Sequence, residues 1–149
     1  MKLLPILLLS FISLTSTMVN GQTQKTSFLI IKSTKNYSSA LKKAQLACNK
    51  LGWTLNLNGN YEDKENGLTN SEVCGCGEEH GYIPRGRYDA GNFISIEYSS
   101  AYEGFTKGYY IVVISSGKRE KVQSVLAKVQ KHYSDAYIKD SDVYVGCMH

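Results

Sequence analysis

The chain has little excess charge of either sign and no block of like charges. Seventeen Lys and Arg residues are set against 13 Asp and Glu residues, a formal net charge of +4. A nucleic-acid-binding protein gathers its basic residues in a patch or stripe. The even scatter seen here therefore argues against a nucleic-acid partner and allows only weak attraction toward an acidic polymer.

Long hydrophobic runs are absent after the first 20 residues. The one apolar run, Leu3 to Leu14, follows Met1-Lys2 and precedes small residues up to Gly21, which is typical of a secretory signal peptide. We expect residues 1–21 to be cleaved, leaving one domain over 22–149 that is secreted or periplasmic and has no membrane span. The alternative is an uncleaved N-terminal helix. No Cys follows the run, which disfavours a lipoprotein anchor.

A recognisable catalytic motif is also lacking. None of the histidines (His80, His132 and His149) has a Ser or Cys in a local motif around it, as an activated nucleophile would require. Adjacent acids occur at Glu78-Glu79 beside His80, and a hydrolase built on these three residues is the least favoured alternative. We therefore expect a protein without catalytic activity, and the sequence indicates no cofactor.

All four cysteines lie in the part expected to be exported. An even count in an oxidising compartment indicates disulfides, at Cys48, Cys74, Cys76 and Cys147. Because a bond between Cys74 and Cys76 would close a very small, strained ring, we expect one of them to pair with Cys48 and the other with Cys147, in either order. The alternative is a zinc site that uses Cys74, Cys76 and Cys147 with His80 and His149, and export disfavours it.

Two stretches, Ser27 to Leu57 and Tyr109 to Val145, share one order of elements: an apolar run, an amphipathic helix pattern and a second short apolar run. The helix patterns comprise Leu41, Ala44, Cys48 and Leu51 in the first stretch and Val122, Val125, Leu126, Val129 and Tyr133 in the second. They indicate an α+β fold, a ferredoxin-like or split βαβ sandwich, in which an antiparallel sheet of about four or five strands carries two helices on one face. We expect the other face to be open for binding.

Local signals place the boundaries of these elements. Asn92 to Tyr98 alternates apolar and polar side chains like a half-buried strand, whereas Tyr109 to Ser115 is apolar on both faces and hence central. The two should form a hairpin. Residues 36–39 (Asn-Tyr-Ser-Ser) supply side-chain oxygens at the expected helix start, and Gly52 sits where a helix stop is expected. Residues 58–91 are rich in glycine and lack any period, which predicts a loop-rich insertion pinned by its two cysteines.

Tyrosine is the most informative residue type. Six of the 11 tyrosines fall within residues 82–110, and tyrosine combines a flat apolar ring with a hydroxyl, which suits a binding surface. The predicted binding residues are Tyr98, Tyr102 and Tyr109 for stacking and Arg85, Arg87 and Lys107 for hydrogen bonds to carboxyl or hydroxyl groups.

The arrangement resembles the sporulation-related repeat (SPOR) domain. The similarity is clearest in three segments of the second half, Tyr109 to Ser116, Lys121 to Lys131 and Tyr133 to Ile138, and weaker in the first half, in Phe28 to Ser33 and Leu41 to Gly52. The resemblance implies non-catalytic binding of peptidoglycan glycan strands along the open sheet face.

A secreted protein-interaction module is the main alternative, as an inhibitor or immunity protein that blocks an extracellular enzyme. Small size, disulfides and a rigid tyrosine-rich loop suit such a binder as well. The position of the exposed aromatic residues distinguishes the two functions. A shallow trough on the sheet face favours the glycan, and a protruding loop pinned by cysteines favours a protein partner.

Overall fold

A computed structural model describes residues 22–70, 81–87 and 89–145. The expected signal peptide lies outside these residues, as do Cys74, Cys76, Cys147, Glu78, Glu79, His80 and His149. The elements are β1 (Gln22–Thr34), α1 (Tyr37–Leu51), β2 (Asn60–Asp63), β3 (Gly67–Asn70), β4 (Gly91–Tyr98), the short 3₁₀ helix η1 (Ser99–Ala101), β5 (Tyr110–Gly117), α2 (Arg119–Gln130) and β6 (Tyr137–Val145).

Four strands form the main sheet in the order β4-β5-β1-β6, and all neighbours are antiparallel. β1 and β4 are consequently parallel, with β5 between them, and β5 and β6 flank β1 in the same way. Each helix therefore crosses over one intervening strand, which is the split βαβ arrangement of a ferredoxin-like sandwich. The predicted fold class and the predicted hairpin of β4 and β5 are confirmed.

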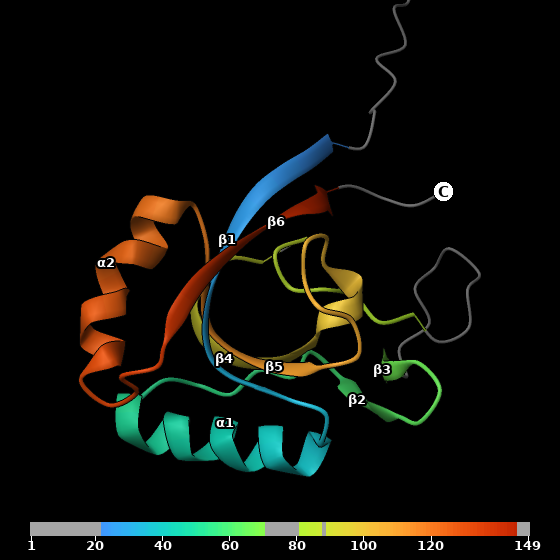
Figure 1. Cartoon of the computed structure of the whole chain (residues 1–149), viewed down its shortest axis with the longest axis horizontal. Coiled ribbons are helices and arrows are strands. Elements are labelled where there is room, and N and C mark those ends of the chain that lie inside the picture. Colours follow the sequence, from blue (N-terminus) through green and yellow to red (C-terminus); the bar gives the residue numbers. More distant parts are fainter. Residues whose placement is uncertain (1–21, 71–80, 88, 146–149) are drawn as a thin grey trace, which may run out of the picture.

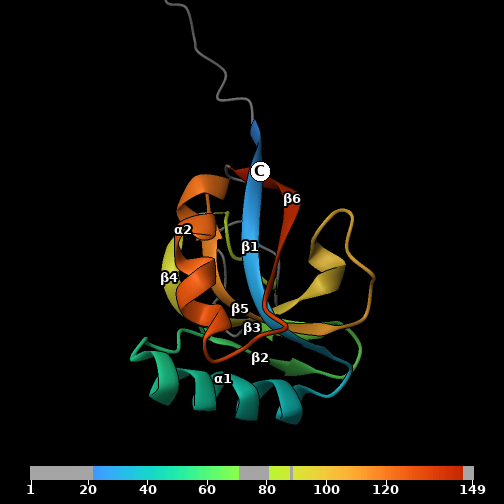
Figure 2. The ribbon, with the colours of Figure 1, turned by 60° about the vertical axis from the view of Figure 1, so that its left-hand side comes forward.

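Both helices pack on one face of the sheet, as the sequence predicts (Figures 1 and 2). α1 is capped by Asn36, whose side chain accepts a hydrogen bond from the Ser39 N–H at 2.7 Å, and it ends at Gly52 in the left-handed conformation. The residues it buries against the sheet are Ala40, Ala44, Ala47 and Leu51. α2 buries Val122 and Val129 in the same cluster, with Ile94, Ile96, Val112 and Ile114 of the strands. Neither described helix has the length and apolar character that crossing a bilayer requires.

The second face of the sheet is not open over its centre, and that expectation was wrong. Phe28, Ile30, Ile111 and Val113 form this face, and each is at most 1% exposed. The segment between β4 and β5 covers them with the rings of Tyr102 and Phe105, both in edge contact with Phe28. Figure 1 shows this yellow to orange segment inside the curve of the sheet, with both helices outside it. A sheet whose central strands are apolar on both faces needs a cover on both.

The predicted insertion contains more structure than its glycine content suggests. β2 and β3 form a hairpin whose turn is held by the Asp63 carboxylate, which accepts from the Glu65 and Asn66 N–H groups at 3.0 and 2.7 Å. The short apolar run that closes the first of the two similar stretches, Trp53 to Leu57, is expected to be a strand but forms only one parallel bridge, between Leu55 and Ile94. The hairpin is tied to the sheet, since the Tyr110 hydroxyl donates to the Gly67 carbonyl oxygen at 3.0 Å.

Substitution of Gly67 tests how tightly the β2–β3 hairpin packs against the sheet. Gly67 has φ +81°, and a Cβ there would overlap the ring of Tyr98. Gly104, at φ +76°, has open space around its Cβ position and serves as the control. We expect Gly104→Ala to lower the free energy of unfolding in urea by about 1–2 kcal/mol, the cost of the left-handed backbone. Gly67→Ala should cost a further 1–3 kcal/mol or so, because it adds an overpacked contact. Equal losses would show that the hairpin yields freely.

Candidate functional site

The structure separates the six binding residues that the sequence predicts. Tyr98 lies on the helix side of the sheet, where its ring centroid is 5.3 Å from that of Tyr110. Tyr102 and Arg85 are buried, 0% and 3% exposed, and as placed they offer no stacking or hydrogen-bonding surface to a ligand. Tyr109 is half-buried and lines a surface hollow.

The remaining two predicted binding residues, Lys107 and Arg87, contact other parts of the chain. The Lys107 ammonium donates to the carbonyl oxygens of Ser100 and Tyr102 at 3.0 and 3.1 Å, and so fastens the segment that covers the sheet. The Arg87 guanidinium lies 5.4 Å from the ring centroid of Tyr144. The six residues therefore do not form one surface.

Arg85 is held by oxygens of the two strands beneath it. Its guanidinium donates to the hydroxyls of Ser95 (3.0 Å) and Ser116 (2.8 Å) and to three carbonyl oxygens, those of Gly91 (2.8 Å), Phe93 (2.9 Å) and Val113 (3.3 Å). Burial lowers the pKa of Arg85 to about 10, and the negative charges of Glu97 and Asp89 oppose that shift. No ion pair joins its guanidinium to a described carboxylate. Arg85 thus fixes its segment to the sheet through neutral acceptors.

The carboxylate of Glu97, 3% exposed, is the second buried charge of this region. Its Oε2 atom accepts from the Tyr82 hydroxyl, from the Tyr102 hydroxyl at 2.9 Å and from the Arg85 N–H at 3.1 Å. Burial and the adjacent Glu97 charge raise the pKa of both tyrosines well above its ordinary value, so both hydroxyls stay protonated as donors. One oxygen of Glu97 thus joins three segments of the chain.

Beside the covering segment between β4 and β5, the second sheet face has a surface recess, which we call the aromatic hollow. It has a volume of about 220 Å³ and is lined by Ser33, Ser99, Phe105, Thr106, Tyr109, Tyr137 and Lys139. In β6, Tyr137 and Lys139 lie opposite Ile30 and Phe28 of β1, which places both on the second face. Tyr137 is 43% exposed. The hollow therefore extends the apolar second face to the surface.

Two cations flank the rings of the aromatic hollow. The Lys139 ammonium lies 4.7 Å from the ring centroid of Phe105, and that of Lys35 lies 5.5 Å from the centroid of Tyr109. Such cation–π contacts keep the ammonium groups beside the rings. The hollow can consequently offer an apolar ring surface and a positive charge to the same ligand.

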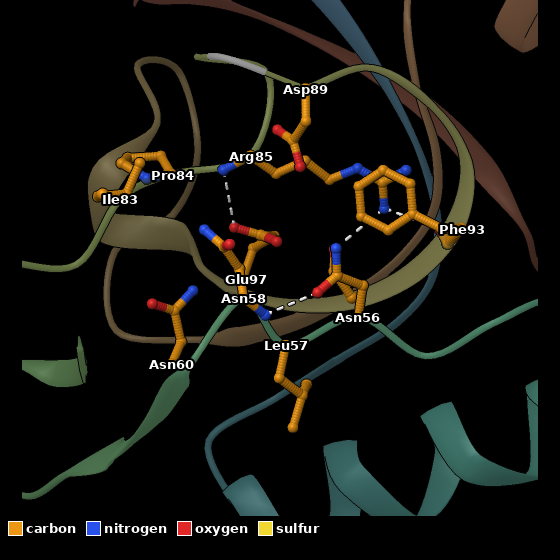
Figure 3. Close-up of a pocket in the computed structure, with 11 residues that line it drawn as sticks. Asn56, Leu57, Asn58, Asn60, Ile83, Pro84, Arg85, Asp89, Phe93 and Glu97 are labelled. Atoms are coloured by element: carbon orange, nitrogen blue, oxygen red, sulfur yellow. Dashed lines mark hydrogen bonds between the residues drawn. The ribbon is translucent and has the colours of Figure 1, made fainter. Parts of the chain in front are cut away.

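A larger recess, which we call the polar pocket, lies between the segment 56–60 on one side and residues 83–85 and Asp89 on the other (Figure 3). Its volume is about 340 Å³, and its lining comprises Asn56, Leu57, Asn58, Asn60, Ile83, Pro84, Arg85, Asp89, Phe93, Ser95 and Glu97. Backbone hydrogen bonds from Asn56 N to Ile94 O and from Ile94 N to Thr54 O, both 2.8 Å, fix one wall against β4. The lining alternates amides, carboxylates and apolar groups.

Cys48 lies half-buried on α1 and forms no disulfide with a described residue, and burial raises the pKa of its thiol. Its predicted partners Cys74 and Cys76 lie outside the described residues, as does Cys147, so the disulfide pairing stays a prediction. Within the described ranges no group of three or more His, Cys, Asp or Glu side chains is placed to hold a metal ion.

Comparison with known proteins gives no match, either to a protein-family model, to a curated protein or to a solved structure. The resemblance to the SPOR family therefore stays a prediction.

Sequence reasoning missed Glu97, Tyr82, Phe105, Tyr137 and Lys139 as members of these sites. Glu97 alternates with Ile94 and Ile96 in β4, a pattern that indicates a residue facing water. Its burial depends on Arg85, which precedes β4 in the chain, and on Tyr102, which follows it, because both fold back over the strand and contact Glu97. For Tyr137 and Lys139 a signal exists, because they have the same strand parity as Ser141 and Val143 and therefore share a face of β6 with these two buried residues.

Replacing Tyr102 by Phe tests the hydrogen bond from its hydroxyl to the Glu97 carboxylate. We expect the free energy of unfolding at pH 7 to fall by about 1–3 kcal/mol, because a buried carboxylate loses a donor. The raised pKa of Tyr102 adds a pH dependence. Above about pH 10 the unfolded chain releases this proton and the folded chain keeps it.

The contribution of Tyr102 is consequently present below pH 10 and lost as the pH rises through the folded pKa. The difference between the two proteins should narrow above pH 10 in urea titrations. Tyr61→Phe, at a position 45% exposed, is the control and should leave stability unchanged. A constant difference up to pH 11 would contradict the assignment of Tyr102 as donor.

Proposed function

We propose that this protein binds peptidoglycan glycan strands without catalysis, and that the aromatic hollow is the binding surface. The observation that carries the proposal is the group of aromatic rings that line this hollow. Phe105 and Tyr109, from the segment between β4 and β5, and Tyr137, from β6, reach one hollow beside Lys139. Aromatic side chains that converge on an exposed hollow are a common basis of recognition.

The chemistry of the hollow suits a carboxylated glycan. Sugar rings present apolar C–H faces that stack on aromatic side chains, and their hydroxyls can bond to Ser33 and Thr106. Lys139 and Lys35 lie beside the rings and would attract the carboxyl groups of the polymer. The positive net charge of the chain also favours a negatively charged ligand.

The size of the hollow favours a polymer over a small molecule. Its volume of about 220 Å³ is below the roughly 300–1,000 Å³ of enclosing small-molecule pockets. A strand that lies across the hollow and places one or two sugars on the rings needs no enclosure. This is the shallow trough that distinguishes a glycan from a protein ligand.

The alternative, a protein-interaction module that blocks an extracellular enzyme, depends on a protruding loop around Cys74 and Cys76. Both residues lie outside the described ranges, so that loop lends the alternative no support. It remains an outcome of the experiment below.

Cosedimentation with purified, peptide-stripped peptidoglycan at low salt tests the proposal. We expect the unmodified protein to be retained and Tyr137→Ala to bind about threefold to tenfold more weakly, because a stacked ring contributes about 0.5–1.5 kcal/mol. Tyr137 is exposed on the edge strand β6, so its removal should leave the fold intact. Tyr61→Ala, which removes an equally exposed ring from β2, should bind normally.

Absence of retention at low salt would overturn the proposal. An equal loss of peptidoglycan binding for Tyr137→Ala and Tyr61→Ala would show that any exposed tyrosine contributes to binding. It would contradict the aromatic hollow as the binding surface. Capture of one secreted enzyme, without retention on the polymer, would favour the inhibitor function instead.

A further inference from the structure

We propose that the polar pocket is a second, independent site, which takes one neutral, hydroxyl-rich molecule of about the size of a sugar ring. The pocket shares no lining residue with the aromatic hollow, and it contains none of the exposed tyrosines. Its volume of about 340 Å³ falls within the range of small-molecule sites. The inference does not rest on the proposed glycan function.

The unused oxygen of Glu97 is the first reason. All three donors to this carboxylate reach Oε2, and no described residue donates to Oε1. Figure 3 shows the carboxylate in the middle of the lining side chains. This oxygen of a pocket-lining residue can accept a hydrogen bond, and a hydroxyl group in the pocket would donate it.

Two asparagines of the pocket wall are the second reason. The Asn56 Oδ1 atom accepts from the Asn58 N–H at 2.9 Å, and the Asn60 Oδ1 atom accepts from the Asn70 side chain at 2.9 Å. These contacts fix both amides and leave their Nδ2 groups as donors at the pocket wall. Oriented amide donors opposite a carboxylate acceptor match the hydroxyl group, which both donates and accepts.

The charges around the pocket select a neutral ligand. The carboxylates of Glu97 and Asp89 line it and disfavour an anion. The buried guanidinium of Arg85, which lies 3.5 Å from the ring centroid of Phe93, disfavours a cation on the same side. Ile83, Pro84 and Phe93 complete the lining with apolar surface, which suits the C–H face of a sugar ring.

Titration of the full chain with glucose and with N-acetylglucosamine, followed by NMR chemical shifts, tests the inference. We expect saturable binding of at least one of these sugars. Asn56→Ala should weaken it about fivefold to tenfold, because one hydrogen bond is lost. Asn56 is exposed, so the substitution should spare the fold. Asn49→Ala, an exposed position on α1, is the matched control and should bind normally.

Glu97→Gln provides the second measurement. It retains the size of the side chain and replaces the carboxylate with an amide, so we expect weaker sugar binding in whatever fraction stays folded. The inference is overturned when neither sugar shows saturable shifts, or when Asn56→Ala binds as well as Asn49→Ala.

The two sites fail in different ways. If the polymer is retained and neither sugar binds, the polar pocket is refuted and the aromatic hollow stands. If Asn56→Ala abolishes sugar binding while Tyr137→Ala leaves it intact, the two sites are independent as proposed. If only Tyr137→Ala removes sugar binding, the sugar occupies the hollow and the polar pocket is refuted.

Discussion

The buried carboxylate of Glu97 is the contact on which the second face of the sheet depends. Its Oε2 atom receives the hydroxyls of Tyr82 and Tyr102 and the N–H of Arg85, so one oxygen joins β4 to the two segments that cover the sheet. A buried charge is stable only where donors replace the lost water. The three donors meet that requirement and at the same time fix where each segment crosses the strands. The guanidinium of Arg85 then reaches the oxygens of β4 and β5.

The cover accounts for both openings and for their different chemistry. Over β1 and β5 it consists of Tyr102 and Phe105, and where it ends the apolar face continues into the aromatic hollow. Beside β4 it consists of Arg85 and its neighbours, which bring polar atoms to the wall of the polar pocket. The same fold therefore offers an aromatic, cationic surface at one place and a recess of amides and carboxylates at the other.

The sequence predicted those parts of the fold that local patterns encode. The fold class, the hairpin of β4 and β5, the helix start at residues 36–39 and the Gly52 stop are confirmed, because side-chain period and capping act within a few residues. The cover was not predicted, since it depends on contacts between distant segments. One signal for it was present, because a central strand that is apolar on both faces, as β5 is, needs partners on both. A polar alternation such as Ser95 and Glu97 looks the same whether water or Arg85 lies above it.

The tyrosine cluster shows why composition alone could not locate the site. Neighbouring tyrosines of one strand point to opposite faces of the sheet, although composition does not distinguish them. Tyr98 lies opposite Tyr110 in the hairpin, which places both on the helix side. Tyr109, just before β5, has the parity of Ile111 and Val113 and lines the aromatic hollow on the second face. The register of the hairpin is therefore sufficient to assign each of these three tyrosines to a face. For Tyr102, which follows η1, no parity applies. Its place is set by where its hydroxyl finds an acceptor, and that acceptor is the carboxylate of Glu97 five residues earlier, on the covered side of β4.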